Sequence, residues 1–510
     1  MNNSSHVGPS KSELLRNFLQ IIEPIDLVQV LLNEVEDDLL KYQFTDEAGI
    51  IKIDALKIPR SLYIVAICVH LNYLIALYGW GIAQKNGSLY IYNGFFWLKV
   101  STDEFKRFLG SSAKFMGYYS PADAVTPQFA NAAYKQFLLS ADIPEQKLDK
   151  SKVLINLQNG TFDVISKELR EHRAEDFLTY CLTYNYDPMA EAPLYQAYLD
   201  RVLPDHNSQH ILLEFHGYFF VPLKLEKALF LLGGGSNGKS VQFEVTTALL
   251  GKDNVSTKTI GDLMSSDMGN DALGKLENKL VNYGSEIDAK QINVDLLKRL
   301  ISGEPVSYRE KYKGSFDLVN TCKFIFNANG LPKTTEQTIA FFRRFLIIPY
   351  VVTITENEKD VDLHTKIITQ ELPGILNLVI LGAERLLENK RFTYSEAGQA
   401  AITQYKHESN VVSLFREDYR LESSNQGKIS NSTLYQAFKQ FCRDNGERSL
   451  SKKQFSHDLK NLGFTTYRTS KERGFKVKMI QKTLYAKQLP SSQESTVPDQ
   501  RSWIQKLLKK

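Results

Sequence analysis

Residues 228–240 read Ala-Leu-Phe-Leu-Leu-Gly-Gly-Gly-Ser-Asn-Gly-Lys-Ser, and they determine how the centre of the chain is interpreted. The five apolar residues predict a buried strand, and the G-x-x-x-x-G-K-S pattern after it leads into a segment of helical character. Glycines let a loop wrap around a phosphate, while backbone N–H groups and the helix N-terminus supply partial positive charge. The predicted phosphate-binding loop consists of Gly233, Gly234, Gly235, Ser236, Asn237, Gly238, Lys239 and Ser240.

Two side chains of this loop have specific tasks. Lys239 is placed to reach the outer phosphates of a nucleotide, and Ser240 to ligate magnesium. Kinases, GTPases and motors share such a loop, so the loop alone leaves the reaction open. The surrounding residues 223–350 alternate short apolar strands with helices, which predicts a parallel α/β sheet.

Composition describes an ordinary globular protein. The 510 residues are 43% hydrophobic and 24% charged, enough for about three domains. The four cysteines lie far apart, without a C-x-x-C pair or zinc-ligand spacing, so we expect reduced thiols packed as small hydrophobes. The polar start MNNSSHVGPSKSELL lacks the order of a secretory signal, which predicts a cytoplasmic protein.

Residues 62–80 are apolar enough to raise the alternative of a membrane span. His70 and Asn72 lie at the centre of this segment, where polar groups are costly in a bilayer. We therefore expect a buried helix in an N-terminal domain and no membrane partner.

Charge is distributed unevenly along the chain. The last 100 residues carry 20 Lys and Arg against 9 Asp and Glu, so they have a net charge of +11, while the preceding 410 residues carry −7. This asymmetry predicts either a C-terminal module that binds a polyanion or a solvated basic face.

Several segments resemble superfamily III helicases of the phage, plasmid and poxvirus primase-helicase kind. The resemblance rests on Asn237 before Gly-Lys-Ser, on the apolar strand with an acidic end at 279–288, on the Asn-x-Leu-Pro ending of 323–332, and on 339–349. It extends over about residues 97–480. It implies an AAA+ motor that hydrolyses ATP with Mg²⁺ and unwinds DNA.

The resemblance also implies roles for individual residues. Glu286 would polarise the attacking water and help Ser240 to hold magnesium, although Ser285 stands where the family usually has a second acid. Asn329 would sense the γ-phosphate, with Asn327 as the alternative. The arginine finger would be Arg344 in preference to Arg343.

An arginine finger in this family acts on the nucleotide of a neighbouring subunit, which implies a homo-oligomeric ring, and a hexamer is expected. The guanidinium suits this task because its planar fork stays charged and donates to phosphate oxygens.

Residues 300–316 resemble the family hairpin that grips DNA in a central channel. The cations Arg309, Lys311 and Lys313 alternate with Tyr308 and Tyr312, so a ribbon would put them on opposite faces. An ordinary exposed hairpin is the alternative.

The C-terminal module has the pattern of a winged helix-turn-helix. A helix is predicted at 432–445 and a second at 451–463, followed by strands at 465–469 and 474–480. On the second helix Phe455 and Leu459 share one face. The expected DNA-binding side chains are Lys453, His457, Lys460 and Arg473. A module that docks a protein is the alternative.

Together, the motifs and the resemblance predict a replicative ATP-dependent helicase of a phage, plasmid or other mobile element that acts on single- and double-stranded DNA. The first hundred residues lack a recognisable zinc-binding or primase block, so a priming activity of this chain is not expected, and a separate primase is a candidate partner. An ATP-regulated initiator without unwinding and a small-molecule kinase are the alternatives. The expected division is 1–95, mostly helical; 96–222, a helical and hairpin domain; 223–405, the motor; 406–482, the winged helix; and 483–510, a linker with a basic helix.

Overall fold

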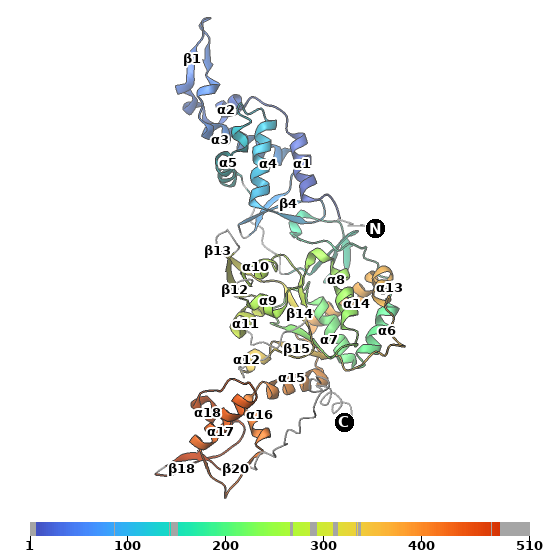
Figure 1. The fold of residues 1–510 in the computed structure, drawn as a ribbon. Helices are drawn as coiled ribbons and strands as arrows, with labels where there is room; N and C mark the ends of the chain where they lie inside the picture. Colours follow the sequence, from blue (N-terminus) through green and yellow to red (C-terminus); the bar gives the residue numbers. More distant parts are fainter. Residues whose placement is uncertain are drawn as a thin grey trace, which may run out of the picture. The chain divides into compact units, whose positions relative to one another are not determined.

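The computed structural model of the chain describes residues 7–85, 87–141, 143, 151–265, 269–285, 293–309, 315–332, 334, 338–470 and 472–479. The chain forms two compact units, Met1–Ala190 and Glu191–Lys510 (Figure 1). Each unit has its own sheets and its own hydrophobic core.

The first unit combines helices with small antiparallel sheets. Its helices are α1 (Lys11–Ile21), α2 (Leu27–Leu39), α3 (Arg60–Leu77), α4 (Thr102–Phe115) and α5 (Pro127–Ser140), with the 3-10 turns η1 (Leu40–Tyr42), η2 (Ala55–Lys57), η3 (Asp123–Val125) and η4 (Ala174–Asp176). Its strands are β1 (Gln43–Thr45), β2 (Ile51–Ile53), β3 (Ile82–Lys85), β4 (Ser88–Tyr92), β5 (Trp97–Val100), β6 (Leu154–Leu157), β7 (Gly160–Asp163) and β8 (Glu168–Arg170).

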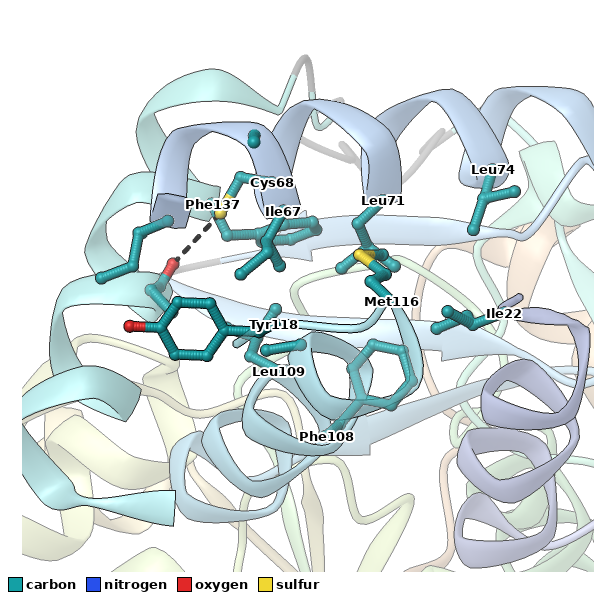
Figure 2. Close-up of a cluster of buried hydrophobic side chains, with 14 of the residues drawn as sticks. Ile22, Ile67, Cys68, Leu71, Leu74, Phe108, Leu109, Met116, Tyr118 and Phe137 are labelled. Atoms are coloured by element: carbon teal, nitrogen blue, oxygen red, sulfur yellow. Dashed lines mark hydrogen bonds between the residues drawn. The ribbon is translucent and has the colours of Figure 1, made fainter. Parts of the chain in front are cut away.

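Helix α3 lies at the centre of the first unit's core. Its residues Ile67 and Cys68 are fully buried and belong to the same cluster as Leu109 of α4 and Phe137 of α5 (Figure 2). The Cys68 thiol lies 3.6 Å from the carbonyl oxygen of Ala133. By length and composition α3 could cross a bilayer, and 39% of its apolar window is buried inside the protein. The packing predicted for this helix is confirmed by these contacts.

Asn-Gly pairs, which favour tight turns, connect the strands of two antiparallel hairpins of this unit. Strand β4 pairs antiparallel with β5 around Asn93 and Gly94, and β6 pairs with β7 around Asn159 and Gly160. The Asn93 side chain stabilises its turn, because its Oδ1 accepts from the N–H groups of two following residues at 3.0 and 2.8 Å.

The second unit begins with two helices and continues through an α/β region. Its helices up to residue 408 are α6 (Pro193–Val202), α7 (His206–Gly217), α8 (Lys239–Leu250), α9 (Ile260–Met264), α10 (Gly269–Gly274), α11 (Val294–Ser302), α12 (Ile339–Phe342), α13 (Leu363–Gln370), α14 (Leu372–Asn389) and α15 (Glu396–Glu408), with the 3-10 turn η5 (Lys252–Asn254). The strands are β9 (Ala228–Leu232), β10 (Val255–Ser256), β11 (Val281–Gly284), β12 (Pro305–Arg309), β13 (Ser315–Val319), β14 (Lys323–Ala328) and β15 (Phe345–Pro349).

Five of these strands form the predicted parallel sheet, in the order β10-β11-β14-β9-β15. The predicted α/β class of this region is thereby confirmed. The loop strand β9 lies between β14 and β15, with all five of its residues buried. Side chains alternate between the two faces of a strand, and both faces of β9 are apolar, so helices must cover the sheet on both sides.

One face of the sheet packs on α9, α10, α11 and α15. Phe230 of β9 and Phe345 of β15 stack there with ring centroids 4.5 Å apart, and Leu263, Leu300 and Tyr405 belong to the same buried cluster. Helices α7 and α14 pack closely on each other in this unit. A Cβ atom on Gly382 of α14 would lie 2.4 Å from a backbone oxygen of α7, so glycine is required at that contact.

Helices α6 and α7, which the sequence analysis assigned to the domain before the motor, belong to the second unit. The buried carboxylate of Glu371 ties α6 to the start of α14, because it accepts from the N–H groups of Leu194 and Tyr195 at 2.9 and 2.8 Å.

The C-terminal part contains helices and short antiparallel strands around a separate core. Its elements are α16 (Val411–Asp418), β16 (Leu421–Ser423), β17 (Ile429–Ser430), α17 (Asn431–Asp444), α18 (Lys452–Asn461), β18 (Thr466–Arg468), β19 (Arg473–Phe475) and β20 (Val477–Met479). Both predicted helices are confirmed within two residues at each end. The predicted second strand, 474–480, is interrupted: β19 pairs with β17 and β18, whereas β20 pairs with β16.

Candidate functional site

The predicted phosphate loop connects the buried strand β9 to helix α8, as its sequence predicts. Gly238 precedes the helix with φ of +88°, and Ser236 also has a positive φ of +56°. A Cβ atom on Gly233 would lie 2.4 Å from the backbone oxygen of Tyr350, so that position must be glycine. Gly234 and Gly235 have open space where a Cβ atom would be.

Lys239 is folded back onto its own loop. Its Nζ donates to the carbonyl oxygens of Gly233 at 2.6 Å and Gly234 at 3.0 Å, and to Oδ1 of Asn237 at 3.1 Å. No carboxylate is among these partners, and burial lowers the pKa of Lys239 to about 8. No described carboxylate partners this buried ammonium, so an anion at the loop would supply a negative charge for it.

Two tyrosines, Tyr198 and Tyr350, form hydrogen bonds with the loop, and neither contact was predicted from the sequence. The Tyr198 hydroxyl donates to the carbonyl oxygen of Gly238 at 2.9 Å, and the backbone oxygen of Tyr350 accepts from Nδ2 of Asn237 at 3.4 Å. Burial raises the pKa of Tyr198 well above its usual value, so this hydroxyl keeps its proton and donates. These contacts join α6 and the end of β15 to the loop, and no local pattern announces them.

The residues expected to assist the loop follow neighbouring strands. Asn329 directly follows β14, the neighbour of β9 in the sheet, and its side chain is exposed. Asn327 is the last but one residue of β14, and its Oδ1 accepts from the Tyr283 hydroxyl at 3.2 Å. Asn329 is therefore the freer of the two amides. Glu286 follows β11 by two residues and lies outside the described residues.

Arg343 and Arg344 lie at the ends of the strands opposite to the phosphate loop. The carbonyl oxygen of Arg344 accepts from the N–H of Ala228 at 2.8 Å, which places both arginines at the amino ends of β9 and β15. The phosphate loop follows the carboxyl end of β9. A strand of five residues spans roughly 16 Å at about 3.3 Å per residue. Neither guanidinium is therefore close to the loop of its own chain.

Arg344 and Arg343 differ in their surroundings. The Arg344 side chain is 9% exposed, and its guanidinium donates to Oγ of Ser302 at 2.9 Å and to the carbonyl oxygen of Ala340, and pairs with Glu226 at 3.4 Å. The Arg343 side chain is 59% exposed and pairs with Glu226 at 3.1 Å. Arg344 is the predicted finger, and Arg343 is the more exposed guanidinium of the two.

The predicted hairpin exists as the antiparallel pair β12 and β13, with Pro305 opposite Val319 and Arg309 opposite Ser315. Of the three predicted DNA contacts, Arg309 is the last residue of β12. Lys311 and Lys313 lie outside the described residues.

Helix α18 has the two faces that its sequence predicts. Phe455 and Leu459 are fully buried, while Lys453, His457 and Lys460 are exposed. Arg473 is exposed on β19, and the structure adds Lys452 and Arg468 to the exposed cations of these elements. Lys452 and Arg468 could have been predicted from the sequence because both residues are basic.

The loop fits a nucleotide with magnesium. Gly234 and Gly235 leave the space beside the loop open, Ser240 is exposed at the start of α8, and Lys239 needs an anion. The described residues contain no group of three or more His, Cys, Asp or Glu side chains that could hold a metal ion. The four cysteines are free and buried, as expected.

Three family descriptions match successive parts of the chain. Residues 73–204 match "D5 N terminal like", residues 231–344 match "Family of unknown function (DUF5906)", and residues 407–495 match "Poxvirus D5 protein-like".

Curated relatives come from viruses. The chain is 24% identical over 331 residues to "Putative helicase 121R" of Invertebrate iridescent virus 3, a match that covers 57% of this chain and 35% of the relative. It is 21% identical over 326 residues to "Putative helicase L207/L206" of Acanthamoeba polyphaga mimivirus, covering 59% of this chain and 34% of the relative. The match therefore spans about a third of the length of these relatives.

Among solved structures, the "A form apo structure of NrS-1 C terminal region-CTR" is similar, with a TM-score of 0.45 and 13% identity, over 80% of this chain and 98% of that chain. A second structure of that region, residues 305–718, has a TM-score of 0.44 and 13% identity, over 80% of this chain and 99% of that one.

Proposed function

This chain belongs to the phage- and poxvirus-type primase-helicase family, and from that premise we propose that it is an ATP-driven DNA helicase of genome replication. The proposal includes an AAA+ motor, hydrolysis of ATP, and assembly into a ring. The observation that carries it is the buried ammonium of Lys239 inside a glycine loop between β9 and α8, which has no carboxylate partner among the described residues.

The loop residues would bind the substrate ATP through backbone N–H groups and Lys239. Nucleotide binding would draw Lys239 away from the loop carbonyls and Asn237, its partners in this structure. Ser240 and Glu286 would hold magnesium, which neutralises phosphate charge when bound. Glu286 would orient the attacking water, and Asn329, exposed beside the loop strand, would contact the terminal phosphate.

The position of Arg343 supports a ring. Its own phosphate loop lies at the far edge of the sheet, whereas its exposed side chain is available to another subunit. We therefore assign Arg343 as the finger supplied in trans. Arg344 would be a structural residue that stabilises the start of β15 through its contacts with Ser302 and Glu226. A hexamer is the expected assembly.

Two regions would contact DNA. The hairpin β12–β13, with Arg309, Lys311 and Lys313, would hold single-stranded DNA. The elements α17, α18 and β18–β19 would form a winged helix that places Lys453, His457, Lys460 and Arg473 against duplex DNA. A separate primase remains a candidate partner.

The test is the rate of ATP hydrolysis of the full chain with and without single-stranded DNA, together with its mass in solution and strand separation of a forked duplex. We expect hydrolysis stimulated by DNA, a ring-sized mass with nucleotide, and unwinding that Lys239→Ala abolishes. Hydrolysis that Lys239→Ala leaves unchanged would refute the assignment of the site. Stimulated hydrolysis without strand separation would refute the helicase activity and favour an initiator.

A further inference from the structure

A cavity of about 730 Å³ lies in the second unit, away from the phosphate loop. It is lined by residues of β15, by Lys227 directly before β9, by Arg385 and Asn389 of α14, by residues 391–395, and by α15. The elements around it contact one another directly, since α7 packs on α14 and α15 packs on β15. Its volume is within the range of small-ligand pockets, roughly 300–1,000 Å³.

The cavity belongs to the amino edge of the sheet. Lys227 precedes β9, and Phe345 begins β15, so both lining residues are at the ends of the strands opposite to the phosphate loop. The separation is roughly 16 Å, the length of a five-residue strand. A nucleotide in the loop would therefore leave this cavity free.

Cations dominate the charge of the cavity. Among the residues that the structure describes, its lining includes Lys227, Arg385 and Arg391 and no carboxylate. Arg385 pairs with the buried Glu214 at 3.1 Å, which neutralises it. Lys227 donates to the carbonyl oxygen of Arg343, and Arg391 has no hydrogen bond or ion pair with any residue that the structure describes. Lys227 is half-buried and Arg391 is exposed, so both positive charges are available to pair with a bound anion.

An exposed ring accompanies these cations. Tyr394 lines the cavity, is 66% exposed, and makes no ring contact with the described part of the chain. Gln399, also exposed, adds an amide that can donate and accept. In sites that bind single-stranded nucleic acid, cations bind the phosphate of a nucleotide and an aromatic ring stacks on its base.

We propose that this cavity is a second nucleotide-binding site, which holds the phosphate of a nucleotide unit on Lys227 and Arg391 and stacks its base on Tyr394. The nucleotide unit is either part of a DNA single strand or a free nucleotide, and both share this chemistry. The site does not depend on the proposed ATP hydrolysis, because its residues are distinct from the loop and from Arg343.

Photocrosslinking of the full chain tests the proposal. One probe is a thymidine tetranucleotide with a 5-iodouracil base, and the other is 8-azido-ADP. Both are applied to the wild type, Lys239→Ala, Arg391→Gln and the matched control Lys390→Gln. Lys390 neighbours Arg391 but is not a lining residue. Crosslinks are mapped by mass spectrometry to the tryptic peptide that contains Tyr394 and ends at Lys406.

We expect one probe to label this peptide in the wild type and equally in Lys239→Ala and Lys390→Gln. Labelling should fall about tenfold in Arg391→Gln, since a charge-assisted hydrogen bond to phosphate is lost. Labelling by the tetranucleotide identifies a strand site, and labelling by 8-azido-ADP identifies a free-nucleotide site. No label at this peptide from either probe, or equal label in Arg391→Gln, would overturn the proposal.

ATP hydrolysis without DNA is measured on the same variants. Arg391→Gln should hydrolyse ATP at the wild-type rate, and its thermal unfolding should match that of Lys390→Gln because Arg391 has no described partner to lose. A wild-type chain that fails to hydrolyse ATP but labels the Tyr394 peptide would refute the proposed motor and leave the second site standing.

Discussion

At the scale of single residues, Lys239 gives the proposed nucleotide site a pH dependence with a defined sign. Its pKa is lowered to about 8 because burial disfavours the ammonium. Phosphate binding needs that ammonium, so the protonated form present below pH 8 binds and the neutral form above it does not. We expect nucleotide affinity to fall as pH rises from 7 to 9, by up to roughly tenfold per pH unit beyond the pKa.

Fluorescence titration with a labelled ADP measures this dependence. Lys239→Arg serves as the control, because a guanidinium stays charged over this range. Whatever affinity the arginine variant retains should change little with pH. A wild-type affinity that is constant from pH 7 to 9 would contradict the assigned role of Lys239.

Glu286 provides a second prediction at this scale. Glu286→Gln keeps the size and hydrogen-bonding capacity of the side chain but loses its charge, so it should bind ATP and hydrolyse it at least 100-fold more slowly, within the range for a lost acid–base group. Quenched-flow measurement of phosphate release checks this. Unimpaired turnover would move the carboxylate that orients the water to another residue, first to Asp288, the next acidic residue in the sequence.

Residue chemistry that depends on long-range contacts was not predictable from the sequence. His216 is buried, its Nε2 lies 2.9 Å from Oγ1 of Thr246, and burial lowers its pKa to about 4. Thr246 is 30 positions away, so no local pattern relates the two. Tyr198 under the loop and the different environments of Arg343 and Arg344 escaped prediction for the same reason.

At the scale of elements, local signals gave dependable predictions. The two Asn-Gly hairpins can be predicted from sequence because adjacent residues encode the tight turn. The phosphate loop predicted its strand and helix because the motif itself requires both. The C-terminal hairpin was less predictable, since β19 and β20 share a continuous β-forming stretch and separate through pairing with distant β17 and β16.

Helix α18 supplies the prediction for the C-terminal elements. Reversing the exposed Lys453 and Lys460 to Glu should weaken duplex binding and make the salt dependence shallower by about 1.8, for two lost phosphate contacts. Fluorescence anisotropy at several salt concentrations measures both. Hydrolysis stimulated by saturating single strands should persist, because the hairpin β12–β13 is a separate element.

The same helix offers a stability control. The double Glu variant changes exposed side chains and should unfold within about 0.5 kcal/mol of the wild type per site. Leu459→Ala removes a fully buried side chain and should destabilise the C-terminal core by about 2–5 kcal/mol. Unchanged duplex affinity and salt slope in the double Glu variant would indicate that α18 docks a protein instead of DNA.

At the scale of the whole molecule, the sheet separates the two halves of the proposed catalytic machinery. The phosphate loop and Asn329 follow the carboxyl ends of β9 and β14, whereas Arg343 precedes the amino end of β15. A single chain therefore presents a nucleotide loop on one edge and an exposed guanidinium on the other. Repetition of such a subunit around a closed ring brings unlike edges together.

Mixing two inactive variants tests this account most directly. Lys239→Ala removes the loop ammonium, and Arg343→Ala removes the finger, so each homogeneous preparation should hydrolyse ATP at a small fraction of the wild-type rate. In mixed rings some intact loops would face intact fingers. We predict that mixing equal amounts restores DNA-stimulated hydrolysis to roughly a quarter of the wild-type rate per ring. Random assembly places an intact loop beside an intact finger at about one interface in four. Mixed assemblies, verified by mass, that remain inactive, or a monomer that is fully active, would contradict the central claim.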